Sequence, residues 1–318
     1  MTSKNKISTV TVSAPATIAN LVCGFDILGM ALEEPRDTLQ VSITDSPGIQ
    51  ITNKDDFDLP SDPLQNVAGV ALQAMLNEYP HVAGFNLISN KQIKPGSGLG
   101  SSAASAAGAV VAANILLDQY FSTEQLVQFA MAGEELASGV KHADNVAPCI
   151  YGGITLIRSL EPTDIIPLSV PKLYVTVIHP QIEIKTSDAR QILRKNVLLK
   201  DAIVQWGNIA GLVTGFLRND HLLISRSLAD IIIEPVRSIL IPGFKEIKTN
   251  SVGAGALGGG IAGSGPSIFM LSANKKTAMD VQNCMKDIYQ QLGIDYNVYV
   301  TTISQWGVRI ENESFNSI

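Results

Sequence analysis

Residues 95–102, Pro-Gly-Ser-Gly-Leu-Gly-Ser-Ser, form a glycine-rich segment that runs directly into a long stretch of small and aliphatic residues. Three glycines within five positions let the backbone turn sharply and come close to a ligand. The stretch that begins at Ser101 is rich in alanine and is interrupted only by Gly108. This composition predicts a buried helix that packs closely on its neighbours. The first turn of such a helix presents unpaired N–H groups, so the segment predicts an anion site.

Three familiar nucleotide-binding patterns do not fit this segment. A Walker A loop requires Gly-Lys-Ser/Thr, and no lysine follows Gly100. A dinucleotide fingerprint requires a later third glycine and an acidic residue at the end of the next strand, whereas Asp118 lies at the end of a predicted helix. The HRD and DFG motifs of protein kinases are also missing. Two hypotheses remain: a phosphate-binding turn of another kind, or a glycine-rich turn with a purely architectural role.

Composition limits the class of protein. The 318 residues are 46% hydrophobic and 16% charged, which is enough apolar material for one large domain or two medium ones. A net charge of −6 disfavours nucleic acid as a partner. The cysteines at 23, 149 and 284 are widely separated and form no CxxC pair, which predicts buried thiols in a reducing compartment.

The first residues predict no membrane association. The chain begins Met-Thr-Ser-Lys-Asn-Lys and shows no apolar core of a signal peptide. The apolar stretch 10–32 is broken by a proline, a glycine and an aspartate, so it does not predict a membrane span. We therefore expect a cytoplasmic protein without a membrane partner.

Periodicity predicts an α+β protein with two parts. In the first part we expect strands at 7–13, 38–44 and 85–88, an irregular loop over 14–26, and helices over 63–78 (capped by Ser61 or Asp62), from 101, and over 123–137 (capped by Ser122 or Thr123). A proline-rich segment near residue 165 predicts a boundary between domains 1–165 and 166–318. In the second part we expect strands at 173–178, 267–271 and 296–303, helices around 188–206, 220–230 and 275–292, and a hairpin near 251–266. That order predicts a ferredoxin-like sandwich.

Three ordered segments, 14–32, 95–108 and 258–267, together resemble the sequence motifs of the GHMP kinase superfamily. The resemblance covers nearly the whole chain. It implies an N-terminal domain like domain 2 of ribosomal protein S5, a ferredoxin-like C-terminal domain, and ATP with Mg²⁺ as cofactors. It places the ATP phosphates on Pro95, Gly96, Ser97, Gly98, Leu99, Gly100, Ser101 and Ser102. Asn66 would lie near the adenine, although a structural asparagine is an equal alternative.

Within the superfamily, the pattern Pro-Ala-x-x-Ala-Asn-Leu-x-x-Gly-Phe-Asp at 15–26 resembles the homoserine kinases. This resemblance implies phosphorylation of the side-chain hydroxyl of L-homoserine to O-phospho-L-homoserine, a step of threonine biosynthesis, by a homodimer. It places Asn20 and Asp26 at the amino-acid site, where a carboxylate suits an ammonium group. The alternative is that both residues only cap an irregular loop.

The segment 134–153 also resembles the homoserine kinases. By this match Glu134 and Ser102 would bind Mg²⁺, which prefers hard oxygen ligands, while His142 and Asn145 would line the substrate. The alternatives are an ordinary exposed helix carboxylate for Glu134 and a structural role for His142.

The second domain contributes Thr186, Arg190 and Arg237, which match substrate-holding positions of the family. A substrate carboxylate needs a bidentate and permanently charged partner, and arginine has that geometry. The alternative for Arg237 is a surface ion pair with Glu234.

Asn145 occupies the place of the catalytic aspartate of mevalonate-kinase-like relatives, seven residues before Gly152. An amide cannot act as a general base, so we predict direct in-line phosphoryl transfer in which Ser102, Glu134, Asn145 and Arg190 assist. Asp144 is the alternative base. The competing functions are a kinase for a mevalonate-like alcohol or a sugar, a decarboxylase of the superfamily, and a regulatory protein that binds nucleotide without turnover.

Overall fold

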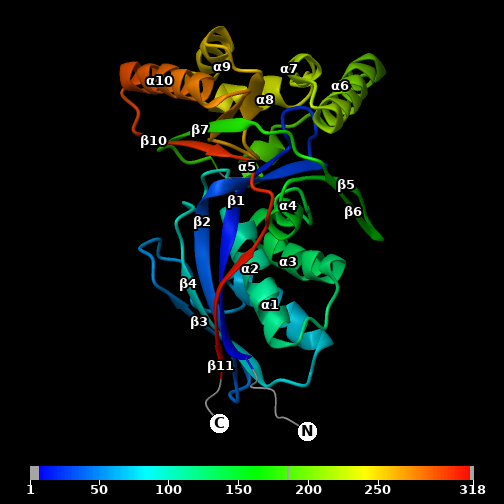
Figure 1. Ribbon diagram of the computed structural model, residues 1–318, viewed down its shortest axis with the longest axis vertical. Coiled ribbons are helices and arrows are strands. Elements are labelled where there is room, and N and C mark those ends of the chain that lie inside the picture. The colour runs from blue at the N-terminus through cyan, green and yellow to red at the C-terminus, as the bar shows by residue number, and fades with distance from the viewer. Residues whose placement is uncertain (1–6, 185, 316–318) are drawn as a thin grey trace.

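The computed structural model describes residues 7–184 and 186–315, and its elements form two sheets with their helices (Figure 1). The first sheet has the order β11-β1-β2-β4-β3, with β5 beside β2 and β6 beside β5. Helices α1 to α4 cover one face of it (Figure 1). The elements are β1 (Ile7–Ala19), β2 (Leu28–Thr44), β3 (Gly48–Asn53), α1 (Val67–Glu78), β4 (Gly84–Asn90), α2 (Ser101–Leu116), α3 (Thr123–Ser138), α4 (Val146–Tyr151), β5 (Ile154–Leu160), β6 (Thr163–Leu168) and β11 (Arg309–Phe315).

The second sheet is antiparallel, with the order β10-β7-β9-β8. Its strands and helices follow the chain order expected for a ferredoxin-like sandwich, so the predicted fold class is confirmed. The elements are β7 (Tyr174–Pro180), α5 (Thr186–Gln191), α6 (Leu199–Arg218), α7 (His221–Ser227), α8 (Glu234–Arg237), η1 (Ser238–Leu240), α9 (Phe244–Gly253), β8 (Gly258–Ile261), β9 (Ile268–Ser272), α10 (Lys275–Leu292) and β10 (Tyr296–Thr302).

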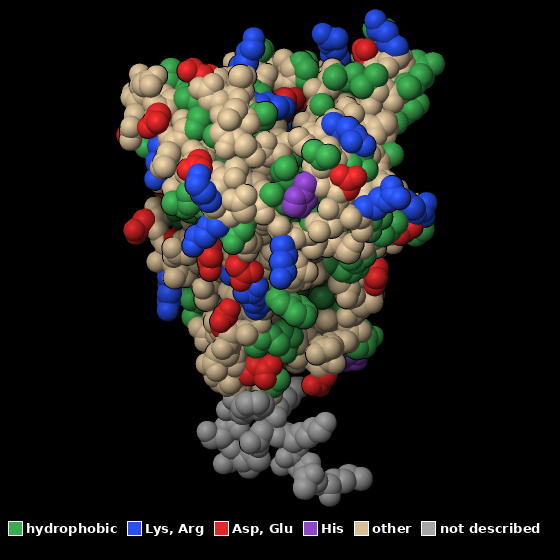
Figure 2. Space-filling view, turned by 45° about the horizontal axis from the view of Figure 1, so that its top comes forward, with side chains coloured by type: hydrophobic (Ala, Val, Ile, Leu, Met, Phe, Trp, Pro, Cys, Tyr) green, Lys and Arg blue, Asp and Glu red, His purple; other side chains and the backbone are tan. Residues whose placement is uncertain are grey.

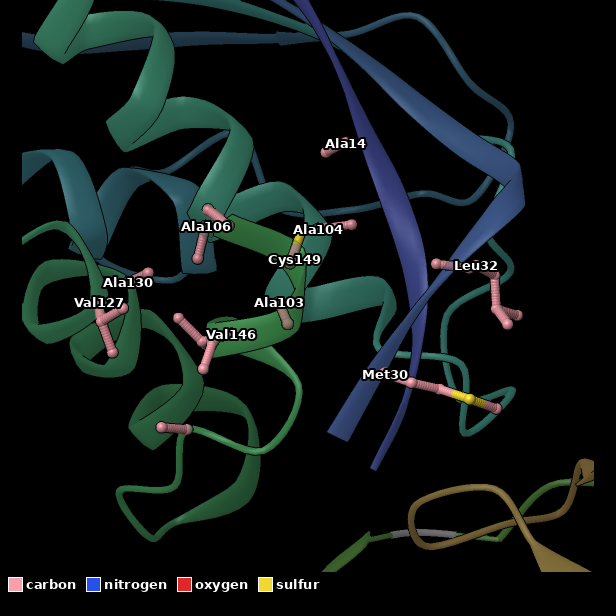
Figure 3. Packing of buried hydrophobic residues seen from close by; sticks show 14 of the residues in the cluster. Ala14, Met30, Leu32, Ala103, Ala104, Ala106, Val127, Ala130, Val146 and Cys149 are labelled. Atoms are coloured by element: carbon pink, nitrogen blue, oxygen red, sulfur yellow. The ribbon is translucent and has the colours of Figure 1, made fainter. Parts of the chain in front are cut away.

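The alanine-rich helix α2 lies at the centre of the first domain, as its composition predicted. All seven of its alanines are fully buried. Figure 3 shows Ala104 turned toward β1, which carries Ala14, and Ala106 turned toward Val127 and Ala130 of α3. Because the side chains are small, the helix is in close contact with the sheet on one side and with α1, α3 and α4 on the other. Its N-terminus therefore has a fixed position.

Several elements begin or end at different residues from those expected. β2 begins at Leu28 instead of residue 38, and in place of the helix expected around 188–206 there are α5 and α6, which extends to Arg218. β1 continues to Ala19, because residues 14–19 pair with β2, and only the segment between Ala19 and Leu28 remains irregular. Helix α1 begins at Val67 and its cap is Asn66, not Ser61 or Asp62. The prolines at 60 and 63 precede the helix and lie outside it.

The chain passes from the first sheet to the second between Leu168 and Tyr174. Residue 165, where the domain boundary was expected, lies inside β6. After β10 the chain returns to the first sheet, where β11 pairs with β1 and brings Phe315 opposite Ile7 (Figure 1). The sequence of β11, Arg-Ile-Glu-Asn-Glu-Ser-Phe, has little apolar alternation, which is why it was not expected to be a strand. Among the described helices, none is long and apolar enough to cross a bilayer.

Candidate active site

The glycine-rich segment is a tight turn between β4 and α2. Gly98 and Gly100 have φ values of +81° and +64°, in the region that favours glycine. A Cβ atom at Gly98 would lie 2.6 Å from the carbonyl oxygen of Ala262, and one at Gly100 would lie 1.9 Å from Oγ1 of Thr17. Both positions therefore need glycine for space as well as for conformation.

Residues of the turn alternate between the interior and a cavity. Ser97 and Leu99 are buried, and the carbonyl oxygen of Leu99 accepts a hydrogen bond from the backbone of Thr17. The hydroxyl of Ser101 donates to the carbonyl oxygen of Ile93. The cavity lies at the N-terminus of α2. Its lining includes Pro95, Gly96, Gly98, Gly100, Ser101, Ser102, Lys91, Glu134, His142, Asn145, Glu183 and Ile184.

Glu134 comes from α3 and points into this cavity. The residue is 3% exposed, and its Oε1 has no hydrogen-bond partner although it is buried. Burial raises the pKa of the carboxyl, and the charge of His142 and the hydroxyl of Ser102 offset this in part. This buried carboxylate oxygen has no hydrogen-bond partner and lies beside a hydroxyl and the glycine-rich turn. Such an oxygen is suited to bind a hard cation. In the described residues there is no cluster of three or more His, Cys, Asp or Glu residues with metal-binding geometry.

His142 lies between two carboxylates. Its Nδ1 is 2.8 Å from Oδ1 of Asp144, and its Nε2 is 3.8 Å from Oε2 of Glu134. Burial alone would lower the pKa of His142, but the hydrogen bond to Asp144 and the charges of Asp144 and Glu134 together raise it from 6.5 to about 9. The imidazole is therefore a cation at neutral pH.

A second group of charged residues lies where the two domains meet. Arg190 forms a bidentate pair with Asp26, at 2.8 and 3.2 Å. Asn20 accepts from the backbone N–H of Asp26 and donates to the carbonyl oxygen of Gly263, which joins the first domain to the second. Asn20 thus holds its loop, while the carboxylate of Asp26 faces an arginine from the other domain.

Arg237 is 4% exposed, and it does not pair with Glu234, which binds Lys248 instead. The guanidinium donates to the carbonyl oxygens of Ala189 and Gly263. Burial, followed by the charge of Arg190, lowers the pKa of Arg237 from 12.5 to about 10, so it remains charged at neutral pH. The surface ion pair considered above as the alternative is therefore wrong.

Two residues near the site were not singled out from the sequence. The ring of Phe25 lies 4.9 Å from the guanidinium carbon of Arg237 and 5.5 Å from that of Arg190, at cation–π distance from both. Thr17 donates to Oδ1 of Asn145 at 2.8 Å. Phe25 stands inside the Gly-Phe-Asp pattern, so that pattern contained a signal for it, whereas the Thr17 contact depends on tertiary structure.

Two further expected residues remain untested. The side chain of Asn66 caps α1: its oxygen accepts from the amides of Ala68 and Gly69, and its nitrogen donates to the carbonyl oxygen of Pro60. Its place near an adenine stays a prediction. Thr186 begins α5, but its side chain lies outside the described residues.

Comparison with known proteins defines the class. Residues 66–153 match the GHMP kinases N terminal domain, and residues 212–291 match the GHMP kinases C terminal domain. The L. major mevalonate kinase, solved in complex with R-mevalonate, shares the fold with a TM-score of 0.65 at 16% identity over 95% of this chain and 96% of that one. The fold and the two matched domains are thus those of a GHMP kinase.

Closer relatives are homoserine kinases. The homoserine kinase of Chloroherpeton thalassium is 44% identical over 315 residues, which cover 95% of this chain and 99% of the relative. The crystal structure of homoserine kinase from Cytophaga hutchinsonii is 45% identical, with a TM-score of 0.91 and 98% coverage of both chains. The chain therefore belongs to the homoserine kinase family, and the resemblance drawn from its motifs is confirmed.

The environment of His142 predicts a pH-dependent contribution to stability. Its pKa is raised on folding from 6.5 to about 9, so the contribution is complete below pH 6.5 and is lost as the pH rises through 9. Without ligands, wild type should exceed His142→Asn in free energy of unfolding by up to about 3 kcal/mol at pH 6, and by much less above pH 9. Urea unfolding of both proteins from pH 6 to 9.5 measures this, and a difference that does not change with pH would contradict it.

Proposed function

We propose that this chain transfers the γ-phosphoryl group of ATP to the side-chain hydroxyl of L-homoserine, which yields O-phospho-L-homoserine for threonine biosynthesis. One observation supports this most strongly. The glycine-rich turn at 95–102 lies close to a group of charged side chains that complements the two charges of a zwitterion. Asp26 offers a carboxylate to an ammonium, and Arg190 and Arg237 offer guanidinium groups to a carboxylate. Homoserine carries both charged groups and a hydroxyl.

At the nucleotide end, ATP is the phosphoryl donor of the family, and the N-terminus of α2 would receive its phosphates. Ser102 and the unpartnered Oε1 of Glu134 would hold Mg²⁺ together with phosphate oxygens and water. The ion, when bound, neutralises phosphate charge. Ser97 and Leu99 would contribute through their backbone, because their side chains are buried.

At the substrate end, Arg190 and Asp26 must separate, or each must bind the substrate while it remains in contact with the other. The two side chains are 30% and 36% exposed, so the pair is of the weak, solvent-screened type and can be exchanged for contacts with a ligand. Arg237 is held in place by two backbone carbonyls and by Phe25, and it would bind the substrate carboxylate without a large rearrangement. Asn20 orients Asp26 for the ammonium.

No side chain serves as a dedicated base in this proposal. Asn145 is an amide whose oxygen is already engaged by Thr17, and the carboxylate of Asp144 is engaged by His142. The hydroxyl proton would pass to a phosphate oxygen or to water as the hydroxyl oxygen bonds to the γ-phosphorus and the bond from that phosphorus to the ADP oxygen breaks. The role of Asn145 and His142 is then to orient and to balance charge.

The direct test is ADP release from Mg·ATP with L-homoserine, mevalonate, galactose or no acceptor. We expect turnover with homoserine at least about 100-fold above the other acceptors, because only homoserine satisfies both Asp26 and the two arginines. Preference for another alcohol would contradict the substrate assignment. ATP binding without turnover on any acceptor would indicate a regulatory protein.

The proposed proton route predicts a mild effect of Asp144→Asn. The change leaves a hydrogen-bonding oxygen beside His142, so kcat with homoserine should fall by about tenfold or less. A general base contributes about 10²- to 10⁴-fold. Initial rates of Asp144→Asn and Asn145→Asp with homoserine measure this. A fall of about 10³-fold in Asp144→Asn, with both KM values unchanged, would make Asp144 the base.

The homodimer implied by the family resemblance also remains a prediction. On α6, Leu199, Ile203, Trp206 and Leu217 lie on one face and are 56–67% exposed. Figure 2 shows hydrophobic side chains gathered at the upper right, where α6 lies. A second copy that packs on this face would bury them. We expect light scattering to give twice the mass of one chain, and Trp206→Glu to give a monomer. A monomeric wild type would contradict the proposal.

A further inference from the structure

A buried ion pair, Lys91–Asp37, lies beneath the glycine-rich turn and has no role in the mechanism above. Nζ of Lys91 is 2.5 Å from Oδ2 of Asp37, and the two side chains are 2% and 1% exposed. Lys91 follows the last residue of β4, and Asp37 lies in β2. The desolvation of two buried charges costs free energy that can exceed their mutual attraction, so the pair by itself does not have to stabilise the fold. Its role is therefore sought in the other hydrogen bonds that the two side chains make.

Asp37 fixes the chain where it leaves β4. Its Oδ1 accepts hydrogen bonds from the backbone N–H groups of Gln92, at 2.7 Å, and Ile93, at 2.8 Å. These are the residues immediately before the turn. The carboxylate therefore binds the lysine with one oxygen and the backbone with the other.

Lys91 fixes the chain where it enters α2. Its Nζ donates to the carbonyl oxygen of Ser101, at 2.9 Å, and to the hydroxyl of Ser105, at 2.7 Å. The hydroxyl of Ser101 donates back to the carbonyl oxygen of Ile93, at 2.8 Å. With the bond to Asp37, all three protons of the ammonium have acceptors. Although Lys91 lines the cavity, it has no proton left for a phosphate.

We propose that the Lys91–Asp37 pair is a positioning element for the nucleotide turn: it ties the backbone before the turn to the first helical turns of α2. The turn contains three glycines at positive φ, and an unfixed turn of this kind would lose conformational freedom on binding a nucleotide. With both ends tied, its N–H groups hold their arrangement before the nucleotide arrives. The proposal rests on the proposed function only in that this turn binds nucleotide phosphates.

The test compares ADP binding, measured by calorimetry without homoserine, with thermal stability. Lys91→Met and Asp37→Asn each leave a buried group without its partner, so both should lower Tm. The double variant removes both charges, and an amide oxygen remains for the two backbone N–H groups. We expect the double variant to regain most of the Tm yet to bind ADP about 10- to 100-fold more weakly. Wild-type ADP affinity in the double variant would overturn the proposal.

Two further variants separate positioning from general destabilisation. Ser105→Ala removes one acceptor of Lys91 without a change of charge. It leaves a buried N–H group without an acceptor, so it should lower Tm and also weaken ADP binding by about fivefold. Glu33→Gln weakens the bidentate pair with Arg309 between β2 and β11, away from the turn, so it should lower Tm and leave ADP affinity unchanged. Equal losses of ADP affinity in Glu33→Gln and Ser105→Ala would overturn the proposal.

Steady-state rates give an independent readout. In Ser105→Ala and the double variant, KM for ATP should rise while KM for homoserine stays within about twofold, because the Asp26 and arginine groups are untouched. A parallel rise of both KM values would contradict a positioning role at the nucleotide turn. If wild type itself failed to bind ADP, the proposed function would be wrong.

Discussion

The burial of α2 is the constraint on which the rest of the site depends. A helix buried on every side can be accommodated between a sheet and three other helices only if its side chains are small. The seven fully buried alanines meet that condition, and Gly108 meets it at the point where a Cβ atom would lie 2.6 Å from Leu39. Because α2 cannot shift, its N-terminus is a fixed point. The glycine-rich turn and the ion pair beneath it are built on that point.

Charge balance is the second organising feature. The negative groups Asp26, Glu134 and Asp144 lie close to the positive groups Arg190, Arg237 and His142, and these residues come from both domains. In the structure, most of these charges are paired with each other. The exceptions are Arg237, whose guanidinium donates to two backbone carbonyl oxygens, and Oε1 of Glu134, which has no hydrogen-bond partner. A zwitterionic substrate and a metal–nucleotide complex carry charges that match these groups. When they bind, each charged side chain exchanges a partner in the protein for one on the ligand, and no buried charge is left unpaired.

Local signals were sufficient for much of this to be predicted from the sequence. The periodicity of β7 and α10 and the alanine content of α2 gave the fold class, and short motifs pointed to Asn20, Asp26, Glu134 and the two arginines. What could not be predicted depends on distant partners. β11 is polar and becomes a strand because it completes the edge beside β1. The buried state of Lys91 depends on Asp37, which is 54 positions away.

The identity of residue 145 follows from the same charge balance. Asn145 lies where its oxygen accepts from Thr17, beside Gly100, and its neighbours Glu134 and Asp144 already place two buried carboxylates near the expected phosphates. An aspartate at this position would add a third negative charge to a region where His142 is the cation between the other two. Desolvation and like-charge repulsion would then raise its pKa and weaken nucleotide binding. A neutral amide avoids both effects, which is consistent with a kinase that relies on alignment and charge neutralisation instead of a carboxylate base.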